Sequence, residues 1–274
     1  MEVKPHIHVM HIDDDSVYHP GGSNNYFVGD PHEEMVLIDT GEQQKDWTQG
    51  ILKLYKQLGR PKIRAILLTH GHGDHIGGLD RIYETMEAPV RCNPKLAKRL
   101  QAIVGSDVVE PLKSREVIEL GDHLHLRALF TPGHEIDHVA FHLKEQQTLF
   151  TGDCVLGASS STVRDLATYM KSLHTLTRFK HDTICPGHGP IVPPPRGENL
   201  VREYIHHREH RERQILDALE RGITDVKAIA RAIYPKNLKK GLWTGAERNV
   251  QTHLKKLKQE GRIVEQPAQF VLAR

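Results

Sequence analysis

Residues 66–79, ILLTHGHGDHIGGL, place an apolar run directly before three histidines and an aspartate within six positions. The intervening Gly71 and Gly73 allow the backbone to turn so that the polar side chains converge. Strongly hydrated side chains crowded at the end of a buried strand cost free energy unless something binds them. The pattern H-x-H-x-D-H therefore predicts a metal site, and imidazole with carboxylate suits Zn²⁺, with Fe or Mn also compatible.

Three further polar residues follow apolar runs and glycine turns: His134 in FTPGH, Asp153 in FTGD and His188 in CPGHG. The complete set of candidate ligands is His70, His72, Asp74, His75, His134, Asp153 and His188. Seven ligands are too many for one tetrahedral ion and suit two ions that share a carboxylate. The sequence therefore predicts a dinuclear site.

The order of apolar runs indicates the fold class. From Tyr26 to about residue 192, short β-type runs alternate with helical stretches, which predicts α/β layering of sheets and covering helices. The segment PIVPPPRGE (190–198) interrupts regular structure, because consecutive prolines cannot continue a helix or a central strand. We therefore expect a metal-binding domain at residues 1–192 and a second domain at residues 193–274.

The second domain has its own pattern. A long helix over ENLVREYIHHREHRERQILDALERG is followed by a predicted helix from Thr224 and by a third over TGAERNVQTHLKKLKQEG, where Thr244 and Glu247 have the spacing of a capping box. The final RIVEQPAQFVLAR predicts two short strands around a turn at Pro267. Short helices followed by a β-hairpin indicate a winged-helix module.

Composition indicates an ordinary globular protein, with 38% hydrophobic and 26% charged residues. The N-terminus has no signal-peptide pattern and no segment approaches the ~20 apolar residues of a membrane span, so we expect a cytoplasmic protein without membrane contact. Three cysteines give no disulfide framework. Cys154 and Cys185 stand beside ligand positions, but free cysteine mostly behaves as a small buried hydrophobe.

Charge is distributed unevenly along the chain. Residues 196–274 hold 17 Lys and Arg against 10 Asp and Glu, whereas the remainder holds 20 against 25. A basic appendage favours an anionic partner such as nucleic acid, although a solvated helix face explains the same charges. The histidines at 206, 207 and 210 are interleaved with Glu and Arg, which favours an ion-paired face over a further metal site.

Together these motifs resemble the metallo-β-lactamase superfamily. GGSNNYFVG, GDCVLG, PGHGP, EYIHHREHRERQIL and HLKKLKQEGRI are further similar to the branch called β-lactamase-like protein 2. The resemblance implies a four-layer αββα sandwich with a small helical winged-helix domain. It also implies a division of the ligands: His70, His72 and His134 hold the first metal, Asp74, His75 and His188 hold the second, and Asp153 bridges both.

Departures from related patterns narrow the function. His72 stands where flavo-diiron members carry Glu, which favours a zinc-type hydrolase, and Asp153 stands where true β-lactamases use Cys or His. Only residues 154–187 separate Asp153 from His188, so the insertion of β-CASP nucleases is missing. Gly71 replaces a bulky aromatic residue that is frequent in the branch, which we expect to alter access to the metals.

The implied mechanism is hydrolysis by a hydroxide that bridges two zinc ions, because bound cations lower the pKa of water from 15.7 to about 7. The target is a carbonyl carbon or a phosphorus, and the metals also stabilise the oxyanion that develops. We expect Asp74 to orient the hydroxide. His138, in TPGHEIDH, is a candidate for a hydrogen-bond donor behind the ligands or a proton carrier.

Three functions fit these features. The first is cleavage of single-stranded RNA, since the similar branch includes RNA endonucleases and the basic module would guide the phosphodiester backbone. The second is thioester hydrolysis, by a glyoxalase II-like enzyme or an acyl thioesterase acting on a small ester or thioester. The third is a ligand-sensing regulator that binds nucleic acid. A homodimer is compatible with each.

Overall fold

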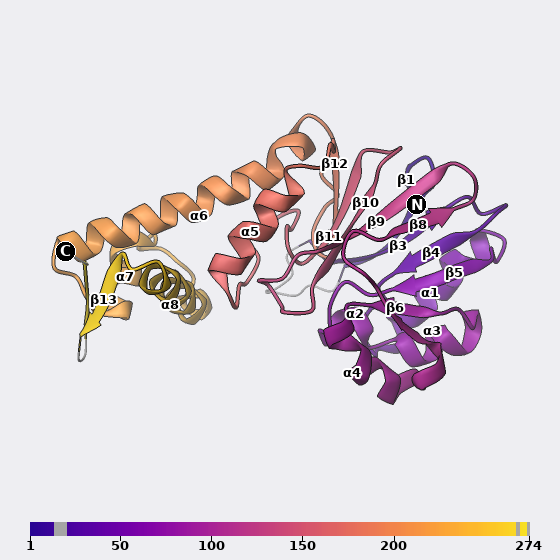
Figure 1. Ribbon diagram of the computed structural model, residues 1–274, viewed down its shortest axis with the longest axis horizontal. Helices are drawn as coiled ribbons and strands as arrows, with labels where there is room; N and C mark the ends of the chain where they lie inside the picture. The colour runs from indigo at the N-terminus through magenta and orange to yellow at the C-terminus, as the bar shows by residue number, and fades with distance from the viewer. Residues whose placement is uncertain (14–20, 267–268, 273–274) are drawn as a thin grey trace.

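The computed structural model describes residues 1–13, 21–266 and 269–272. Two β-sheets stack face to face, helices cover the outer face of each sheet, and a long helix leads away to a small C-terminal module (Figure 1). The predicted α/β four-layer architecture is thereby confirmed. Within the described ranges, no helix combines the length and the apolar character needed to cross a membrane.

The first sheet has seven strands in chain order. They are β1 (Glu2–Lys4), β2 (Ile7–Ile12), β3 (Ser23–Gly29), β4 (Met35–Ile38), β5 (Ile63–Leu67), β6 (Val90–Cys92) and β7 (Val109–Pro111). Strands β1 to β4 pair antiparallel and β4 to β7 pair parallel. The helices of this half are α1 (Lys45–Gln57), α2 (Gly73–Ile76), α3 (Leu79–Met86), α4 (Pro94–Val104) and the 3-10 helix η1 (Ser106–Val108).

The second sheet has five strands in the order β12-β11-β10-β9-β8. Their bounds are β8 (Val117–Leu120), β9 (Leu124–Phe130), β10 (Val139–Leu143), β11 (Thr148–Gly152) and β12 (Thr183–Pro186). Only the β11–β12 pair is parallel among the described strands of this sheet. Helices α5 (Leu166–Leu176) and α6 (Arg196–Glu220) cover its outer face (Figure 1).

The side-chain alternation of β4 explains why the two sheets stack. Val36 and Ile38 pack between the sheets, in one core with Phe141 of β10, whereas Met35 and Leu37 belong to the core formed with α1, α3 and α4. Successive strand residues point to opposite faces, so a strand that is apolar at every position must be covered on both sides.

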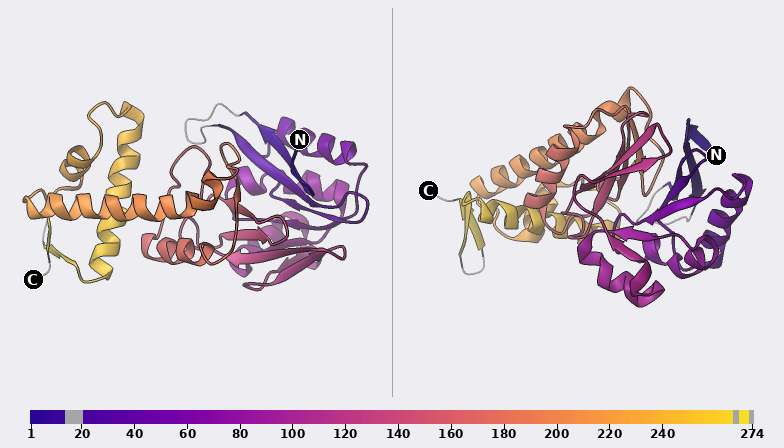
Figure 2. Two further views of the ribbon diagram at one scale, coloured as in Figure 1. Left: turned by 90° about the horizontal axis from the view of Figure 1, so that it is seen from above. Right: turned by 45° about the vertical axis from the view of Figure 1, so that its right-hand side comes forward.

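Helix α6 takes part in two cores. Leu200 and Tyr204 in its first half pack with α5 and the second sheet, and Ile215 and Leu219 in its second half pack within the C-terminal module. That module contains α7 (Val226–Ile233), the 3-10 helix η2 (Lys240–Leu242), α8 (Trp243–Gln259), β13 (Ile263–Gln266) and β14 (Gln269–Leu272). Figure 2 shows α8 crossing α6 at the far end of the molecule. The boundary after residue 192 stays a prediction.

Two details of the module differ from the sequence expectations. Helix α8 follows η2 directly and begins at Trp243 with no side-chain cap, so Thr244 lies inside the helix and the predicted capping box is wrong. Helix α7 begins at Val226 rather than Thr224, because the Asp225 side chain accepts the Ala228 N–H at 2.9 Å as an N-cap. The hairpin pairs as predicted, although its turn at residue 267 lies outside the described residues.

Candidate metal centre

The ends of four strands supply the candidate ligands. His70 follows β5, His134 follows β9, Asp153 follows β11 and His188 follows β12. The β5 strand belongs to the first sheet and the other three to the second, so the residues meet at one edge of the sandwich. All seven predicted ligands gather here in two groups: His70, His72, His134 and Asp153 in the first, and Asp74, His75 and His188 in the second.

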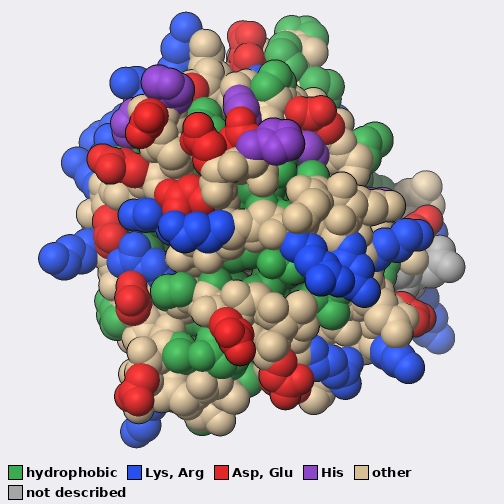
Figure 3. Space-filling view, turned by 90° about the vertical axis from the view of Figure 1, so that its right-hand side faces the viewer, with side chains coloured by type: hydrophobic (Ala, Val, Ile, Leu, Met, Phe, Trp, Pro, Cys, Tyr) green, Lys and Arg blue, Asp and Glu red, His purple; other side chains and the backbone are tan. Residues whose placement is uncertain are grey.

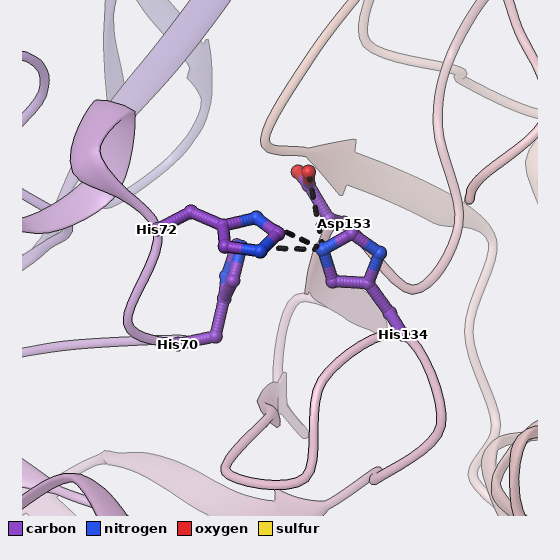
Figure 4. A group of neighbouring side chains, drawn as sticks. All are labelled: His70, His72, His134 and Asp153. Atoms are coloured by element: carbon purple, nitrogen blue, oxygen red, sulfur yellow. Dashed lines mark hydrogen bonds and ion pairs between the residues drawn. The ribbon is translucent and has the colours of Figure 1, made fainter. Parts of the chain in front are cut away.

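The first group has the dimensions of a tetrahedral metal site. Nε2 of His134 lies 3.3 Å from Nε2 of His70, 3.3 Å from Nδ1 of His72 and 3.6 Å from Oδ2 of Asp153. Figure 4 shows the three rings and the carboxylate facing one another from opposite loops. Bonds of about 2.0–2.1 Å to a tetrahedral Zn²⁺ separate neighbouring ligand atoms by roughly 3.3–3.4 Å.

The second group meets the other oxygen of Asp153. Oδ1 of Asp153 lies 3.4 Å from Nε2 of His75 and 3.3 Å from Nε2 of His188, and Oδ2 of Asp74 lies 3.1 Å from the same His188 nitrogen. Asp153 therefore gives one oxygen to each group. This is the placement expected of a carboxylate shared between two cations.

Hydrogen bonds on the outer sides of the rings fix the tautomers. Nδ1–H of His134 donates to the Thr162 carbonyl at 2.7 Å, and Nε2–H of His72 donates to Glu135 Oε1 at 2.8 Å. A carbonyl or a carboxylate only accepts, so the proton of each ring lies on its outer nitrogen. The inner nitrogens keep their lone pairs and are ready to bind a cation.

Asp39 fixes two further rings and was not predicted from the sequence. It accepts Nδ1–H of His75 at 2.8 Å, the Thr69 N–H at 2.8 Å and the Thr69 hydroxyl at 2.9 Å. Because that hydroxyl donates its only proton to Asp39, it can only accept from Nδ1–H of His70, which lies 3.0 Å away. One buried carboxylate therefore orients a ligand of each group.

Electrostatics keeps the ligand carboxylates ionised. Burial alone would raise the pKa of Asp153, but His75 and His188 outweigh it and hold this pKa well below its usual range. Burial likewise opposes a lowered pKa at Asp74, which His75 and His188 bring about. Burial would also lower the pKa of His75, but Asp39, Asp74 and Asp153 raise it. The site is thus arranged around anionic oxygens that suit a divalent cation.

The residues present fit a pair of metal ions. Inner lone pairs of His70, His72 and His134 face one another at contact distance, which is unfavourable unless a cation lies among them. Nε2 of His75 and Oδ1 of Asp153 are buried and make no hydrogen bond to any residue that the structure describes. Buried polar atoms are normally satisfied, so a ligand is the natural partner. The donor set of imidazole and carboxylate suits zinc, whose identity here stays a prediction.

His138 lies behind the ligands. Its Nδ1–H donates to the Thr131 hydroxyl at 2.8 Å, and its Nε2 accepts the backbone N–H of Asp153 at 3.2 Å. Burial lowers the pKa of His138 well below its usual value. This geometry favours a neutral residue that positions Asp153 over a proton carrier.

Other candidates lie elsewhere. Cys154 and Cys185 are buried free thiols, burial raises the pKa of Cys154 to about 12, and neither belongs to the two groups found in the described chain. The exposed histidines at 206, 207 and 210 are likewise in no metal-binding group of the described residues. The sequence signal for Asp39 was available in LIDTG, where an aspartate and a glycine end an apolar run as they do at Asp153.

Comparison with known proteins agrees with this geometry. A family profile described as metallo-beta-lactamase superfamily matches residues 18–188, and one described as beta-lactamase associated winged helix domain matches residues 226–269. Both predicted modules are thereby confirmed.

Similar proteins cover nearly the whole chain. A Beta-lactamase-like protein 2 homolog from Drosophila melanogaster is 36% identical over 253 residues, which are 88% of this chain and 84% of that protein. One from Caenorhabditis elegans is 32% identical over 256 residues, 90% and 81% of the two chains. A solved beta-lactamase domain protein from Burkholderia ambifaria superposes with a TM-score of 0.80 at 18% identity, covering 100% and 93% of the two chains, which shows a shared fold.

Proposed function

This chain belongs to the metallo-β-lactamase superfamily, and from that premise we propose that it is a dinuclear zinc hydrolase that cleaves the phosphodiester backbone of single-stranded RNA. The family match and the two His and Asp clusters identify a hydrolase of this superfamily. The observation that carries the dinuclear proposal is the carboxylate of Asp153, whose two oxygens face different groups.

The residues of the site have separate roles in the proposed hydrolysis. Two cations held by these residues would supply Lewis acidity and an ionised water at neutral pH. Asp153 holds the two groups at a fixed separation, and His138 accepts the backbone N–H of Asp153. The Asp74 carboxylate, whose pKa is lowered, would accept a hydrogen bond from that water and orient it. The protein would therefore contribute the geometry of the reacting groups.

Unpaired charge on the C-terminal module supports an anionic substrate. Lys256, Lys258 and Arg262 are engaged by glutamates. Other basic side chains, one directly before η2 and the rest in η2 and α8, are exposed and form no ion pair within the described chain: Lys239, Lys240, Arg248 and Lys255. Residues 248 and 255 are seven apart and share one helix face, which suits contacts with successive phosphates.

The opposite end of the molecule carries mixed charge. In Figure 3 the Lys and Arg side chains on that end are interspersed with Asp and Glu. Opposite charges side by side offset one another, and salt screens the remaining potential beyond about one Debye length, ~8–10 Å, so this face attracts a polyanion weakly. Guidance of RNA would therefore come from the C-terminal module.

Thioester hydrolysis is the second candidate. Ile136 is 62% exposed although it lies two residues after His134. An exposed aliphatic side chain beside metal ligands offers a contact for the acyl chain of a thioester, whose burial is worth about 25 cal/mol per Å².

The deciding experiment is turnover of zinc-loaded protein on labelled single-stranded RNA and, in parallel, on a panel of acyl-CoA thioesters, with Asp153→Ala as the blank. RNA cleavage that the blank lacks, and that Arg248→Glu with Lys255→Glu weakens, is the expected result. Intact RNA with thioester turnover would refute the nuclease and identify the second candidate.

A further inference from the structure

Arg208 of α6 is buried, with 2% of its surface exposed, although arginine is rarely buried without an acidic partner. No ion pair among the described residues includes it. Its Nη2 donates to the Ser161 carbonyl at 2.6 Å and to the Ser160 hydroxyl at 2.9 Å, and its Nη1 to Asn249 Oδ1 at 3.3 Å. The guanidinium carbon also lies 5.6 Å from the centroid of the Tyr169 ring. A buried cation whose described partners are all neutral depends on the position of each hydrogen-bond acceptor, so Arg208 favours one arrangement of these acceptors.

The serines belong to residues 156–165, the later part of the segment between β11 and α5, which we call the 156–165 loop. The next carbonyl along this loop, that of Thr162, accepts Nδ1–H of His134. The Ser161 hydroxyl donates to the same carbonyl at 3.0 Å and lies 3.3 Å from the same imidazole nitrogen. Arg208 therefore holds the peptide that directly precedes the acceptor of a candidate metal ligand.

A second side chain of α6 holds the start of the loop. The Tyr204 hydroxyl accepts the Leu156 N–H at 2.9 Å and lies within hydrogen-bond distance of the Ser159 carbonyl. Tyr204 and Arg208 are four residues apart and share one face of α6. The loop is thus attached to α6 at two points, and α6 continues into the C-terminal module (Figure 1).

We propose that Arg208 is a positioning residue for the first metal site and that, through Asn249 of α8, it joins the C-terminal module to His134. The guanidinium fork holds the 156–165 loop so that the Thr162 carbonyl keeps His134 in the tautomer with a free Nε2. This inference rests on the metal-binding part of the proposed function and is independent of the substrate.

The test is Zn²⁺ titration of metal-free Arg208→Met against a chromophoric chelator. Replacing a partner behind a metal ligand typically weakens metal binding 10- to 100-fold, and we expect about 10-fold for one of the two ions, with the other unchanged. Arg208→Lys should recover part of this affinity, because an ammonium reaches one carbonyl but lacks the fork. The imidazole N–H resonance of His134 in the metal-free protein should broaden in Arg208→Met as its hydrogen bond loosens.

Arg211→Met is the matched control. Arg211 lies on the same helix, donates to the Ile233 carbonyl at 2.9 Å and stacks 4.0 Å from the Tyr234 ring centroid. The Tyr234 hydroxyl accepts from Asn249 at 2.8 Å, but within the described residues Arg211 makes no hydrogen bond to the 156–165 loop, so its loss leaves the contact between Arg208 and that loop in place. Equal zinc affinities in Arg208→Met and wild type, or an equal loss in Arg211→Met, would overturn the proposal. If Arg208→Met does not fold, Arg208→Lys carries the same comparison. Zinc affinity needs no substrate, so a negative RNA assay leaves this result standing.

Discussion

Asp39→Asn is the sharpest test of how the metal site is built. The side chain is buried and accepts three hydrogen bonds, two from Thr69 and one from Nδ1–H of His75. Asparagine has the same shape and tolerates the positive φ of 61° at this position. It nevertheless replaces one accepting oxygen with a donating NH₂ group. The Thr69 hydroxyl and Nδ1–H of His75 share Oδ2, so both face a donor when the NH₂ group takes that position.

The cost follows from the tautomer of His75. If the asparagine oxygen keeps the Thr69 N–H, the NH₂ group faces Nδ1 of His75, and the ring is satisfied only by moving its proton to Nε2, the nitrogen that faces Asp153. Binding a metal then requires the unfavoured tautomer and loses a charge-assisted hydrogen bond of about 1.5–3 kcal/mol. Since about 1.4 kcal/mol is tenfold, zinc affinity of the second site should fall roughly 10- to 100-fold.

The assay is competition for Zn²⁺ with a chelator at two pH values. Asp39, Asp74 and Asp153 raise the pKa of His75, so the higher pH should lie above this pKa, where the ring is neutral in either tautomer. A loss of affinity caused by the tautomer should persist there, unlike a loss caused by protonation. Asp165→Asn is the matched control, because Asp165 caps α5 by accepting the Thr168 N–H, which an asparagine oxygen does equally well. Wild-type affinity for both ions in Asp39→Asn would refute the tautomer argument.

Three further predictions concern stability. His253 is fully buried, and burial and Arg208 lower its pKa to about 3, below the unfolded value of 6.5. Its contribution to the free energy of unfolding is therefore present above pH 6.5 and is lost as the pH falls toward 3. The free energy of unfolding should depend less on pH in His253→Leu than in wild type. Gly71→Trp should lower the free energy of unfolding by about 1–3 kcal/mol in denaturant titrations, because a Cβ there already lies 2.8 Å from Leu96. Chelation should lower the Tm of wild type but not of Asp153→Ala, measured by calorimetry.

The sequence predicts the candidate metal ligands better than it predicts the residues that hold those ligands in place through hydrogen bonds. His70, His134, Asp153 and His188 each follow an apolar run and have a glycine beside them, and in the structure each of them follows a strand. Asp39 shows the same pattern, but its partner His75 is far along the chain and only the pairing of β4 with β5 brings them together. The local periodicity of apolar residues predicts each strand, but it does not predict which strand ends lie next to one another.

Arg208 shows the same limit on a helix. In the sequence Arg208 stands among glutamates, which predicts an ion-paired face. In the structure, Glu212 instead pairs with Lys256 of α8 and with Arg262, which follows α8. Which side of α6 is buried changes along its length, because one half faces the body and the other the module. A single hydrophobic stripe therefore could not identify the buried cation. The predicted capping box of α8 is wrong for a related reason: η2 ends directly before α8, so the helical turn begins earlier in the chain than Thr244.

Helix α6 also determines how the module can move. Its 25 residues span about 37 Å at 1.5 Å per residue. A tilt of 10° at the end anchored on the second sheet would carry the far end by roughly 6 Å on that length. The module is thus joined to the sandwich by a rigid helix and not by a flexible linker. A partner that binds α8 therefore transmits force through α6 to the sandwich, at one edge of which the two metal groups meet.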